Sequence, residues 1–383
     1  NIKVIDGEKE AYFGGVAALN LLHDDTFVTV DIGGGSTEFC FIKNGKIEKS
    51  ISLNIGTVRI KELYFNKDDI DGAKKNILDN LKKILTSDVE IPKRVVGIGG
   101  SIRALSKMIM VKNDYPLDIL HGFTYNAKKE LSLLEKIVVA RNNDELKSLG
   151  VKKDRFDTIK EGAFIFKTIL DELSIQEVVT SGVGVREGVY LTDLLRNSNH
   201  KFPANFNVSV RSLLDRFEID QKQSAFMGNN AGKIFDVLKP LHNLDSKFRA
   251  LLIVSSKLHS IGSTLNFYKS NDNAFDFILN GLNYDFLHSS RIVVAHTIKF
   301  SKKSLPTKSE ILKYEELLPS LSVMQWMSFM ISLNIAINQD LSRPKVSYEL
   351  KNNVLKIDLS NNSFLIQSNI DKLESPDDLI IEL

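Results

Sequence analysis

The sequence has 383 residues, of which 43% are hydrophobic and 26% charged, a balance typical of a globular protein with sizeable cores and two or three domains. The net charge of +2 argues against general nucleic-acid binding, and no apolar run is long enough to span a membrane. Cys40 is the single cysteine, so no disulfide can form within the chain, and a reducing, cytoplasmic location is expected.

The first predicted elements lie within residues 4–11. Residues 4–6 are expected to form a short strand, and Gly7 is followed by a helix whose first turn carries Glu8 and Glu10. Acidic side chains are favourable at a helix N-terminus, so compensation of the helix dipole explains both glutamates without any catalytic role. A function for either glutamate therefore needs support from other segments.

Residues 31–38, Asp-Ile-Gly-Gly-Gly-Ser-Thr-Glu, carry the most informative motif. A strand is expected before them over 27–30 and another over 38–42, with a hairpin turn at 43–46. Three glycines let the backbone turn tightly and bring its N–H groups close to an anion. Walker and dinucleotide loops open a helix, so neither fits. The remaining interpretation is the phosphate loop of an actin-like ATPase, in which the Asp faces a hydrated metal. The alternative is a flexible turn with no ligand.

Two more strand-then-glycine junctions follow along the chain. Residues 94–103 are expected to form a buried strand, a glycine loop and a helix that begins at Ser101. Residues 178–188 repeat that order, and a helix is expected over 187–196. Three such junctions in one domain suggest a polyphosphorylated ligand that is held at several points.

The pattern changes after residue 196. Residues 197–207 are polar and turn-rich and are expected to form a linker. Helical apolar spacing then predicts helices over 208–217, 231–241, 248–259, 274–282, 286–300 and 321–338. In the tail, strands are expected over 346–350, 354–359 and 364–367, joined by Asn-Asn turns.

Residues 7–11, 31–38, 97–103 and 181–188 together resemble the exopolyphosphatase / guanosine pentaphosphate phosphohydrolase (Ppx/GppA) family in residue type, order and spacing. The likeness covers the chain up to about residue 340. It implies an α/β actin-like (ribonuclease H-like) ATPase lobe followed by an all-helical HD-like domain and a small β-rich C-terminal segment. The implied boundaries are 1–196 for the lobe, 197–207 for the linker, 208–340 for the helical domain and 341–383 for the C-terminal segment.

The same resemblance implies roles for individual residues. Glu10 would be the general base that activates water, while Asp31 would hold Mg2+ through water and Glu38 would be a second acidic residue beside the metal. The residues expected to cradle a phosphate are Gly33, Gly34, Gly35, Ser36 and Thr37. The residues expected in the two further nucleotide or polyphosphate loops are Gly99, Gly100, Ser101, Arg103, Gly182, Gly184 and Arg186.

The implied activity is Mg2+-dependent phosphohydrolysis that releases terminal phosphate from inorganic polyphosphate, from guanosine pentaphosphate, or from both. The alternative is a non-hydrolytic regulatory protein that binds an alarmone or another nucleotide. Glu10 favours the enzyme, because a hydrolase needs a carboxylate there and a sensor does not. A sugar or acetate kinase of the same superfamily is less attractive, because such enzymes do not join a segment like 7–11 to a helical domain of this type.

Family members begin with a further actin-like lobe that carries its own strand-and-loop motif. We expect this lobe to be missing from the present sequence, with residue 1 in the strand that leads to the Glu10 helix. Because actin-like enzymes bind their ligand between two lobes, the 383 residues would then form one wall of the active site and have little or no hydrolase activity alone.

The helical region raises the question of a second metal site, because the HD fold holds a metal with a His-Asp pair and further histidines. Here Ser260 follows His259, and no defensible ligand spacing links His259 to His242, His288 or His296. These histidines are therefore expected to be surface residues or satisfied core residues. The domain is expected to be a degenerate scaffold that mediates homodimerisation and shapes a channel for a polyanion.

Overall fold

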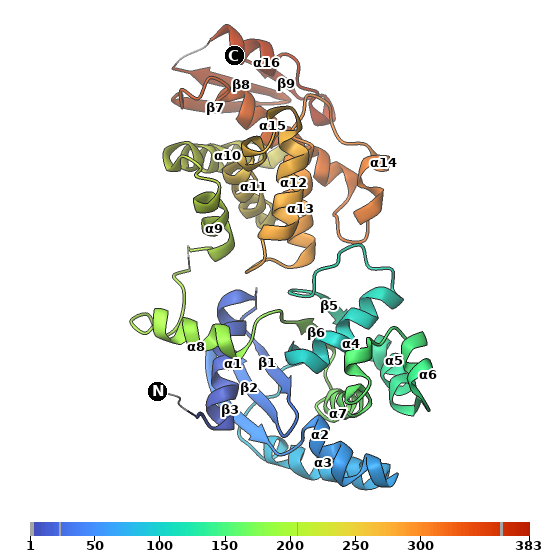
Figure 1. Ribbon diagram of the computed structural model, residues 1–383. Coiled ribbons are helices and arrows are strands. Elements are labelled where there is room, and N and C mark those ends of the chain that lie inside the picture. Colours follow the sequence, from blue (N-terminus) through green and yellow to red (C-terminus); the bar gives the residue numbers. More distant parts are fainter. Residues whose placement is uncertain (1–3, 23, 205, 361–362) are drawn as a thin grey trace. The chain divides into compact units, whose positions relative to one another are not determined.

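The structure is a computed structural model that describes residues 4–22, 24–204, 206–360 and 363–383. The chain divides into two compact units, Asn1–Phe206 and Asn207–Leu383, which are described separately below (Figure 1). Among the described residues, no helix combines the length and the apolar character that crossing a membrane would require.

A six-stranded mixed sheet with the strand order β3-β2-β1-β4-β6-β5 forms the centre of the first unit. Its strands are β1 (Phe27–Ile32), β2 (Thr37–Lys43), β3 (Lys46–Leu53), β4 (Arg94–Ile98), β5 (Thr124–Asn126) and β6 (Glu177–Thr180). The strands β1, β4 and β6 are parallel to one another, whereas β2, β3 and β5 pair antiparallel with their neighbours. The carboxyl ends of β1, β4 and β6 therefore lie at one edge of the sheet.

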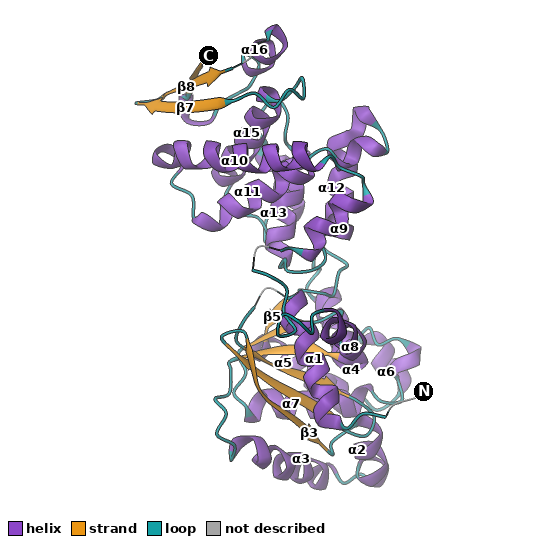
Figure 2. Cartoon of the chain, turned by 90° about the vertical axis from the view of Figure 1, so that its left-hand side faces the viewer, coloured by secondary structure: helices purple, strands orange, loops and turns teal. Residues whose placement is uncertain are grey.

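Helices cover both faces of this sheet (Figure 2). They are α1 (Gly7–Leu21), α2 (Thr57–Leu63), α3 (Ile70–Leu85), α4 (Gly99–Lys112), α5 (Ala127–Val139), α6 (Asn143–Ser148), α7 (Ile159–Glu172) and α8 (Val185–Leu194), with short 3-10 turns η1 (Phe65–Lys67) and η2 (Lys153–Arg155). Alternate residues of β1 divide between the faces. Val28 and Val30 join a large core with α3, α4, α5 and α7, whereas Phe27 packs with Ala18 of α1 on the opposite face.

The helix α1 packs closely against β2 and against α8 because glycines occupy both points of contact. A Cβ atom on Gly15 would lie 2.3 Å from Sγ of Cys40 in β2. A Cβ atom on Gly188 of α8 would lie 1.8 Å from the backbone oxygen of Phe13. Cys40 is fully buried, as expected of a small core residue. The helix that carries Glu10 is thus fixed between the sheet and α8.

The strand predicted over residues 4–6 is wrong. Asp6 is instead the N-cap of α1, because its Oδ1 accepts a hydrogen bond of 2.8 Å from the N–H of Lys9. Residues 4 and 5 join no strand, and residues 1–3, including the expected strand position of residue 1, lie outside the described part of the chain.

The hairpin predicted at residues 43–46 is confirmed. The strands β2 and β3 are joined by Asn44 and Gly45, whose φ angles are +49° and +68°. A two-residue turn with both φ values positive matches the right-handed twist of the flanking strands, and Asn-Gly is the favoured sequence for it.

The second unit is mainly helical. Its helices are α9 (Val208–Arg216), α10 (Gln221–His242), α11 (Ser246–Leu258), α12 (Ser270–Gly281), α13 (His288–Lys299), α14 (Lys308–Ile311), α15 (Leu321–Ile337) and α16 (Phe364–Ile370), with 3-10 turns η3 (Ile261–Thr264), η4 (Phe267–Lys269), η5 (Leu312–Tyr314) and η6 (Pro376–Asp378). The six helices predicted between residues 208 and 338 are confirmed, and most residues of α13 and α15 are buried.

The tail is only partly as predicted. It forms a sheet in the order β7-β8-β9 from β7 (Val346–Lys351), β8 (Val354–Leu359) and β9 (Ile380–Glu382). The strand expected over 364–367 is wrong, because Oγ of Ser363 accepts from the N–H of Ile366 and caps α16. Ile366 and Ile370 are buried one helical turn apart. The Asn-Asn turn expected at 361–362 lies outside the described residues.

Candidate active site

The three glycine junctions meet at one edge of the sheet of the first unit. They follow β1, β4 and β6, which are parallel, so their carboxyl ends point the same way. Ligands of open α/β sheets bind outside the carboxyl ends of the strands. The sequence motifs at residues 33–35, 99–101 and 181–184 are therefore brought to the same side of the sheet, but their peptide groups are used differently.

In the first loop, residues 33–35, the carbonyl groups are occupied by protein donors. The Gly33 oxygen accepts from the N–H of Thr57, and the Gly34 oxygen accepts from that of Val58, both at 2.9 Å. The Gly35 oxygen accepts from Nε of Arg59 at 3.0 Å. These donors belong to the first turn of α2, whose N–H groups have no acceptor within the helix itself. The N-terminus of α2 therefore holds the first loop by its carbonyls.

Unlike the carbonyls, two of the three amide groups of this loop have no partner among the described residues. The N–H of Gly33 closes a turn to the oxygen of Ser36 at 3.0 Å. Gly34 and Gly35 are exposed, and within the described part of the chain their N–H groups donate to no protein acceptor. Gly56 makes this packing possible, since a Cβ atom there would lie 2.3 Å from the Gly34 oxygen. The loop thus presents two backbone donors outward, the arrangement that cradles an anion.

Thr37 does not join this cradle, although the sequence motif includes it. Its side chain is fully buried, and its hydroxyl donates to the backbone oxygen of Ile55. Ser36 is only partly buried, and its side chain opposes the rise in the pKa of Glu38 that burial causes. The expected phosphate contact of Thr37 is therefore replaced by a structural one.

Three carboxylates gather beside the first loop. Asp31 and Glu38 are directly opposite each other in the antiparallel pair β1 and β2, so their side chains share one face. Glu10 of α1 is close enough to act electrostatically on both. Burial, followed by the charge of Glu10, raises the pKa of Asp31 to about 6, and Arg103 opposes this rise. Burial also raises the pKa of Glu38, which accepts a hydrogen bond of 2.9 Å from Ser52.

The second loop lies directly against Asp31. Gly99 has a φ of +82°, and a Cβ atom there would lie 2.1 Å from Oδ1 of Asp31. Only glycine fits this conformation and this contact without strain. The helix α4 begins here, and its N-cap, Ile98, makes no capping side-chain hydrogen bond within the described chain. Nε of Arg103 donates to the Gly99 oxygen at 3.0 Å. A glycine carbonyl thus accepts from a protein donor here as well, and the start of α4 carries no side-chain cap.

The third loop, residues 181–184, differs from the expectation. Its N–H groups are all used within the protein: Gly182 donates to Nδ1 of His121 at 3.0 Å, and Val183 donates to Oγ of Ser181 at 3.2 Å. Gly184 donates to Oε2 of Glu187 at 2.8 Å. The backbone of Gly182 and Gly184 therefore offers no free donor to a phosphate, and the exposed side chain of Arg186 is what remains of the predicted third contact.

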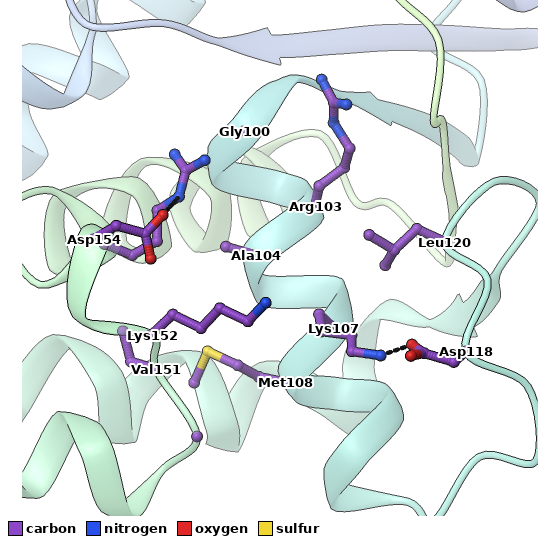
Figure 3. A pocket seen from close by; sticks show the side chains of 12 residues that line it. Gly100, Arg103, Ala104, Lys107, Met108, Asp118, Leu120, Val151, Lys152 and Asp154 are labelled. Carbon is purple, nitrogen blue, oxygen red and sulfur yellow. Dashed lines mark ion pairs between the residues drawn. The ribbon is translucent and has the colours of Figure 1, made fainter.

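A cationic pocket of about 530 Å³ lies next to the second loop (Figure 3). Its charged lining residues are Arg103, Lys107, Lys152, Arg155, Asp118 and Asp154. Lys107 pairs with Asp118, and Nε of Arg155 lies 3.6 Å from Oδ2 of Asp154. The guanidinium of Arg155 also covers Gly100, where a Cβ atom would lie 2.8 Å from Nη1. Four cations against two anions leave this pocket positive.

Sequence reasoning identified Arg103 but missed Lys107 and Arg155. The spacing of Arg103 and Lys107 places both on one face of α4, a signal that was available once the helix was predicted. Arg155 belongs to the 3-10 turn η2, which approaches Gly100 only through the tertiary fold.

The carboxylates fit a magnesium ion in their chemistry. Among the described residues, no group of three or more His, Cys, Asp or Glu side chains is arranged to hold a metal ion. Mg2+ commonly takes only one or two carboxylates and completes its shell with water and substrate phosphates. Asp31 and Glu38 supply two, and a divalent cation would relieve the burial and repulsion that raise the pKa of both.

Three histidines of the second unit, His242, His259 and His296, contact backbone groups. His242 accepts from the N–H of Leu244 and lies 2.9 Å from the Phe235 oxygen. Nδ1 of His259 lies 2.8 Å from the Ser256 oxygen, and Nδ1 of His296 lies 3.0 Å from that of Ile292. Burial lowers the pKa of His296 to about 4. His288 is also buried.

Comparison with known proteins adds the following likenesses. Residues 1–197 match the model of the Ppx/GppA phosphatase family. A guanosine-5'-triphosphate,3'-diphosphate pyrophosphatase of Aeromonas hydrophila is 25% identical over 289 residues, which cover 73% of this chain and 56% of that protein. The present chain thus spans little more than half the length of this curated relative.

Solved structures give two further comparisons. A Ppx/GppA family member of Aquifex aeolicus is 28% identical with a TM-score of 0.44, and the match covers 51% of this chain and 65% of that one. An exopolyphosphatase of Cytophaga hutchinsonii is 22% identical with a TM-score of 0.45, again over 51% of this chain and 65% of the other.

Proposed function

The chain belongs to the Ppx/GppA phosphatase family, and from this premise we propose that the protein hydrolyses terminal phosphoanhydride bonds of inorganic polyphosphate, guanosine pentaphosphate, or both. The observation that carries the proposal is the first loop, where outward-facing amides lie beside three carboxylates. A phosphoryl group needs donors for its oxygens, and water needs a base close by. In this proposal the amides of Gly34 and Gly35 would serve as the donors and Glu10 as the base.

In the proposed reaction, a water molecule attacks the terminal phosphorus while Glu10 takes a proton from that water. The new P–O bond forms as the anhydride P–O bond breaks, and the bond electrons leave with the bridging oxygen. The N–H groups of Gly34 and Gly35 would bind equatorial oxygens of the transferred group, and the uncapped start of α4 would bind a neighbouring phosphate. Mg2+, held by Asp31 and Glu38, would offset negative charge on the phosphates.

The cationic pocket supports a substrate with several phosphates. It begins at Gly100, beside the start of α4, so phosphates further from the reacting bond could continue into it. Arg103, Lys152 and Arg155 would offset their charge, because guanidinium and ammonium groups are the usual partners of phosphate. A linear polyphosphate and a guanosine pentaphosphate both meet this requirement.

Further parts of the proposal rest on family membership. They are an actin-like ATPase fold for the first unit, an HD-like and metal-free helical domain in the second, assembly as a homodimer, and a cytoplasmic location. In this proposal the second unit serves as scaffold for the assembly and for a polyanion channel.

The test is phosphate release from polyphosphate and from guanosine pentaphosphate with Mg2+, using the full-length protein. Glu10→Gln should lower kcat on the order of 10²- to 10⁴-fold, the range typical of general acid–base catalysis. Glu8→Gln is the matched control, because Glu8 is an exposed glutamate in the same helical turn, and it should leave kcat unchanged. Nucleotide binding without phosphate release in the wild type would support the non-hydrolytic regulator instead.

A further inference from the structure

His121 lies in the segment between α4 and β5 and is only 8% exposed. Its two ring nitrogens contact two different elements. Nε2 lies 2.8 Å from the backbone oxygen of Leu21, and Nδ1 lies 3.0 Å from the backbone nitrogen of Gly182. A single buried side chain therefore links the end of α1 to the third glycine loop.

The hydrogen bonds fix the chemical state of this imidazole. A backbone N–H can only donate, so Nδ1 must accept from Gly182 and carries no proton. A backbone oxygen can only accept, so Nε2 must carry the proton that bonds to Leu21. His121 thus acts as a neutral imidazole with its proton on Nε2.

The two linked elements both bear on the candidate active site. Leu21 is the last residue of α1, the helix whose first turns carry Glu10. Gly182 belongs to the loop that leads into α8, and α8 packs so closely on α1 that Gly188 has no room for a side chain beside Phe13. His121 therefore completes a closed arrangement of α1, the third loop and α8, and its bond to Gly182 is one of those that turn the loop's amides inward.

We propose that His121 is a positioning residue, which holds α1 and the third loop in one fixed arrangement and thereby sets the position of Glu10 relative to the first loop. This inference rests on the proposed function, because a change in the position of Glu10 affects kcat only if Glu10 accepts the proton from water. His121 itself contacts no substrate in this account. Its loss should act on kcat and leave KM nearly unchanged, since phosphate-binding amides lie in other loops.

The chain offers a matched control in His242. Its two ring nitrogens are bonded like those of His121: it is also 8% exposed, its Nδ1 accepts from a backbone N–H, and its Nε2 contacts a backbone oxygen, each at 2.9 Å. The difference is the location, because His242 belongs to the second unit. Replacing either residue removes the same two kinds of hydrogen bond to the backbone.

The experiment compares His121→Phe, His121→Gln and His242→Phe in the full-length protein. Phenylalanine retains a ring but makes neither hydrogen bond, whereas the glutamine amide can accept from Gly182 and donate to Leu21. We expect His121→Phe to lower kcat on the order of 10- to 100-fold, as misplacement of a catalytic group does, with KM within about twofold. His121→Gln should recover most of kcat, and His242→Phe should match the wild type.

A kcat for His121→Phe within about twofold of the wild type would overturn the proposal, as would a glutamine variant as impaired as the phenylalanine variant. Amide hydrogen exchange in the unmodified protein provides a test that depends on neither variant folding. The N–H of Gly182 should exchange at least about 10-fold more slowly than that of Gly35, although both residues are exposed. Equal exchange would also overturn the proposal. A wild type that exchanges as expected but releases no phosphate would contradict the proposed hydrolase and leave the contacts of His121 intact.

Discussion

The loop at residues 33–35 and the loop at residues 181–184 both follow a strand of the same sheet, yet they use their peptide groups in opposite ways. The carbonyls of the first loop accept hydrogen bonds from the N-terminus of α2, and the amides of Gly34 and Gly35 face outward. In the loop at residues 181–184, the amides donate hydrogen bonds to the side chains of His121, Ser181 and Glu187. Glycine richness permits a close approach of backbone to ligand, but the direction of the hydrogen bonds decides whether an anion can bind.

The surroundings explain this difference. A helix N-terminus offers unsatisfied N–H donors, so a loop packed against it must turn its carbonyls toward the helix. The first loop is packed in this way against α2, at Gly56. The third loop instead meets an imidazole nitrogen and a carboxylate, which are acceptors and therefore take its amides. The partner of each loop thus determines which loop is available for phosphate.

Gly56→Ala should disturb the first loop more than any other single change considered below. Its Cβ atom would lie 2.3 Å from the Gly34 oxygen, a backbone atom that cannot move without distorting the first loop. We expect the free energy of unfolding to fall by about 1–3 kcal/mol or more, as for an overpacked site, with loss of phosphate binding. Urea unfolding measures the first effect and phosphate titration the second.

Gly35→Ala is the control for stability in that experiment, because a Cβ atom on Gly35 meets nothing within 4 Å. It should unfold at the wild-type urea concentration. Two variants of equal stability would show that the first loop is not packed as described.

The next effect concerns the carboxylate beside the first loop. The folded pKa of Asp31, about 6, exceeds its ordinary value of 3.8, so the folded state binds the proton more tightly than the unfolded state. This contribution to stability is complete below pH 3.8 and is lost as the pH rises through about 6. Asp31→Asn should therefore be more stable than the metal-free wild type at pH 8, by at most about 3 kcal/mol. Thermal unfolding between pH 4 and pH 8 should show this difference growing with pH.

Adding Mg2+ should reduce the difference in stability between the wild type and Asp31→Asn. At pH 8 it should stabilise the wild type, because binding to the folded state alone raises stability, and it should stabilise Asp31→Asn less. Asp276→Asn, at an exposed position on α12, serves as the matched control and should behave as the wild type. An Asp31→Asn variant that gains no stability at pH 8 would contradict the raised pKa.

The smallest expected effect lies in the third loop. Glu187→Ala removes the acceptor of the Gly184 N–H and should lower the free energy of unfolding by about 1 kcal/mol, the typical contribution of one hydrogen bond. Phosphate affinity should stay the same, because this loop donates nothing to the anion in our account. Glu187→Gln retains an acceptor oxygen and should lose less stability. Weaker phosphate binding by the alanine variant at unchanged stability would place the third loop in the binding site.

Local patterns predicted much of the fold and part of the site. The Asn44-Gly45 hairpin and the helices after residue 208 follow from turn chemistry and apolar spacing, which neighbouring residues determine. The first and second loops were found because glycines after a strand are a local signal. The strand predicted at 364–367 is wrong because the side chain of Ser363 caps a helix there, in which Ile366 and Ile370 are buried one turn apart.

The remaining features depend on contacts between distant segments. His121 reaches Gly182, Arg155 reaches Gly100, and Thr37 turns its hydroxyl to Ile55, and no sequence motif contains both members of any of these pairs. Hydrogen-bond direction in a glycine loop is likewise a property of its tertiary partners. Sequence therefore located the candidate phosphate loops but could not tell which of them keep their amides free.

The most direct test of this account is a titration of the chain, labelled with 15N at glycine, with inorganic phosphate and Mg2+, followed by amide resonances. The resonances of Gly34, Gly35 and Gly100 should shift, since their loops present outward donors or a helix start without a side-chain cap. The resonances of Gly182 and Gly184 should stay in place, because both amides are already bonded within the protein. Shifts confined to Gly182 and Gly184, with Gly34 and Gly35 unchanged, would contradict it.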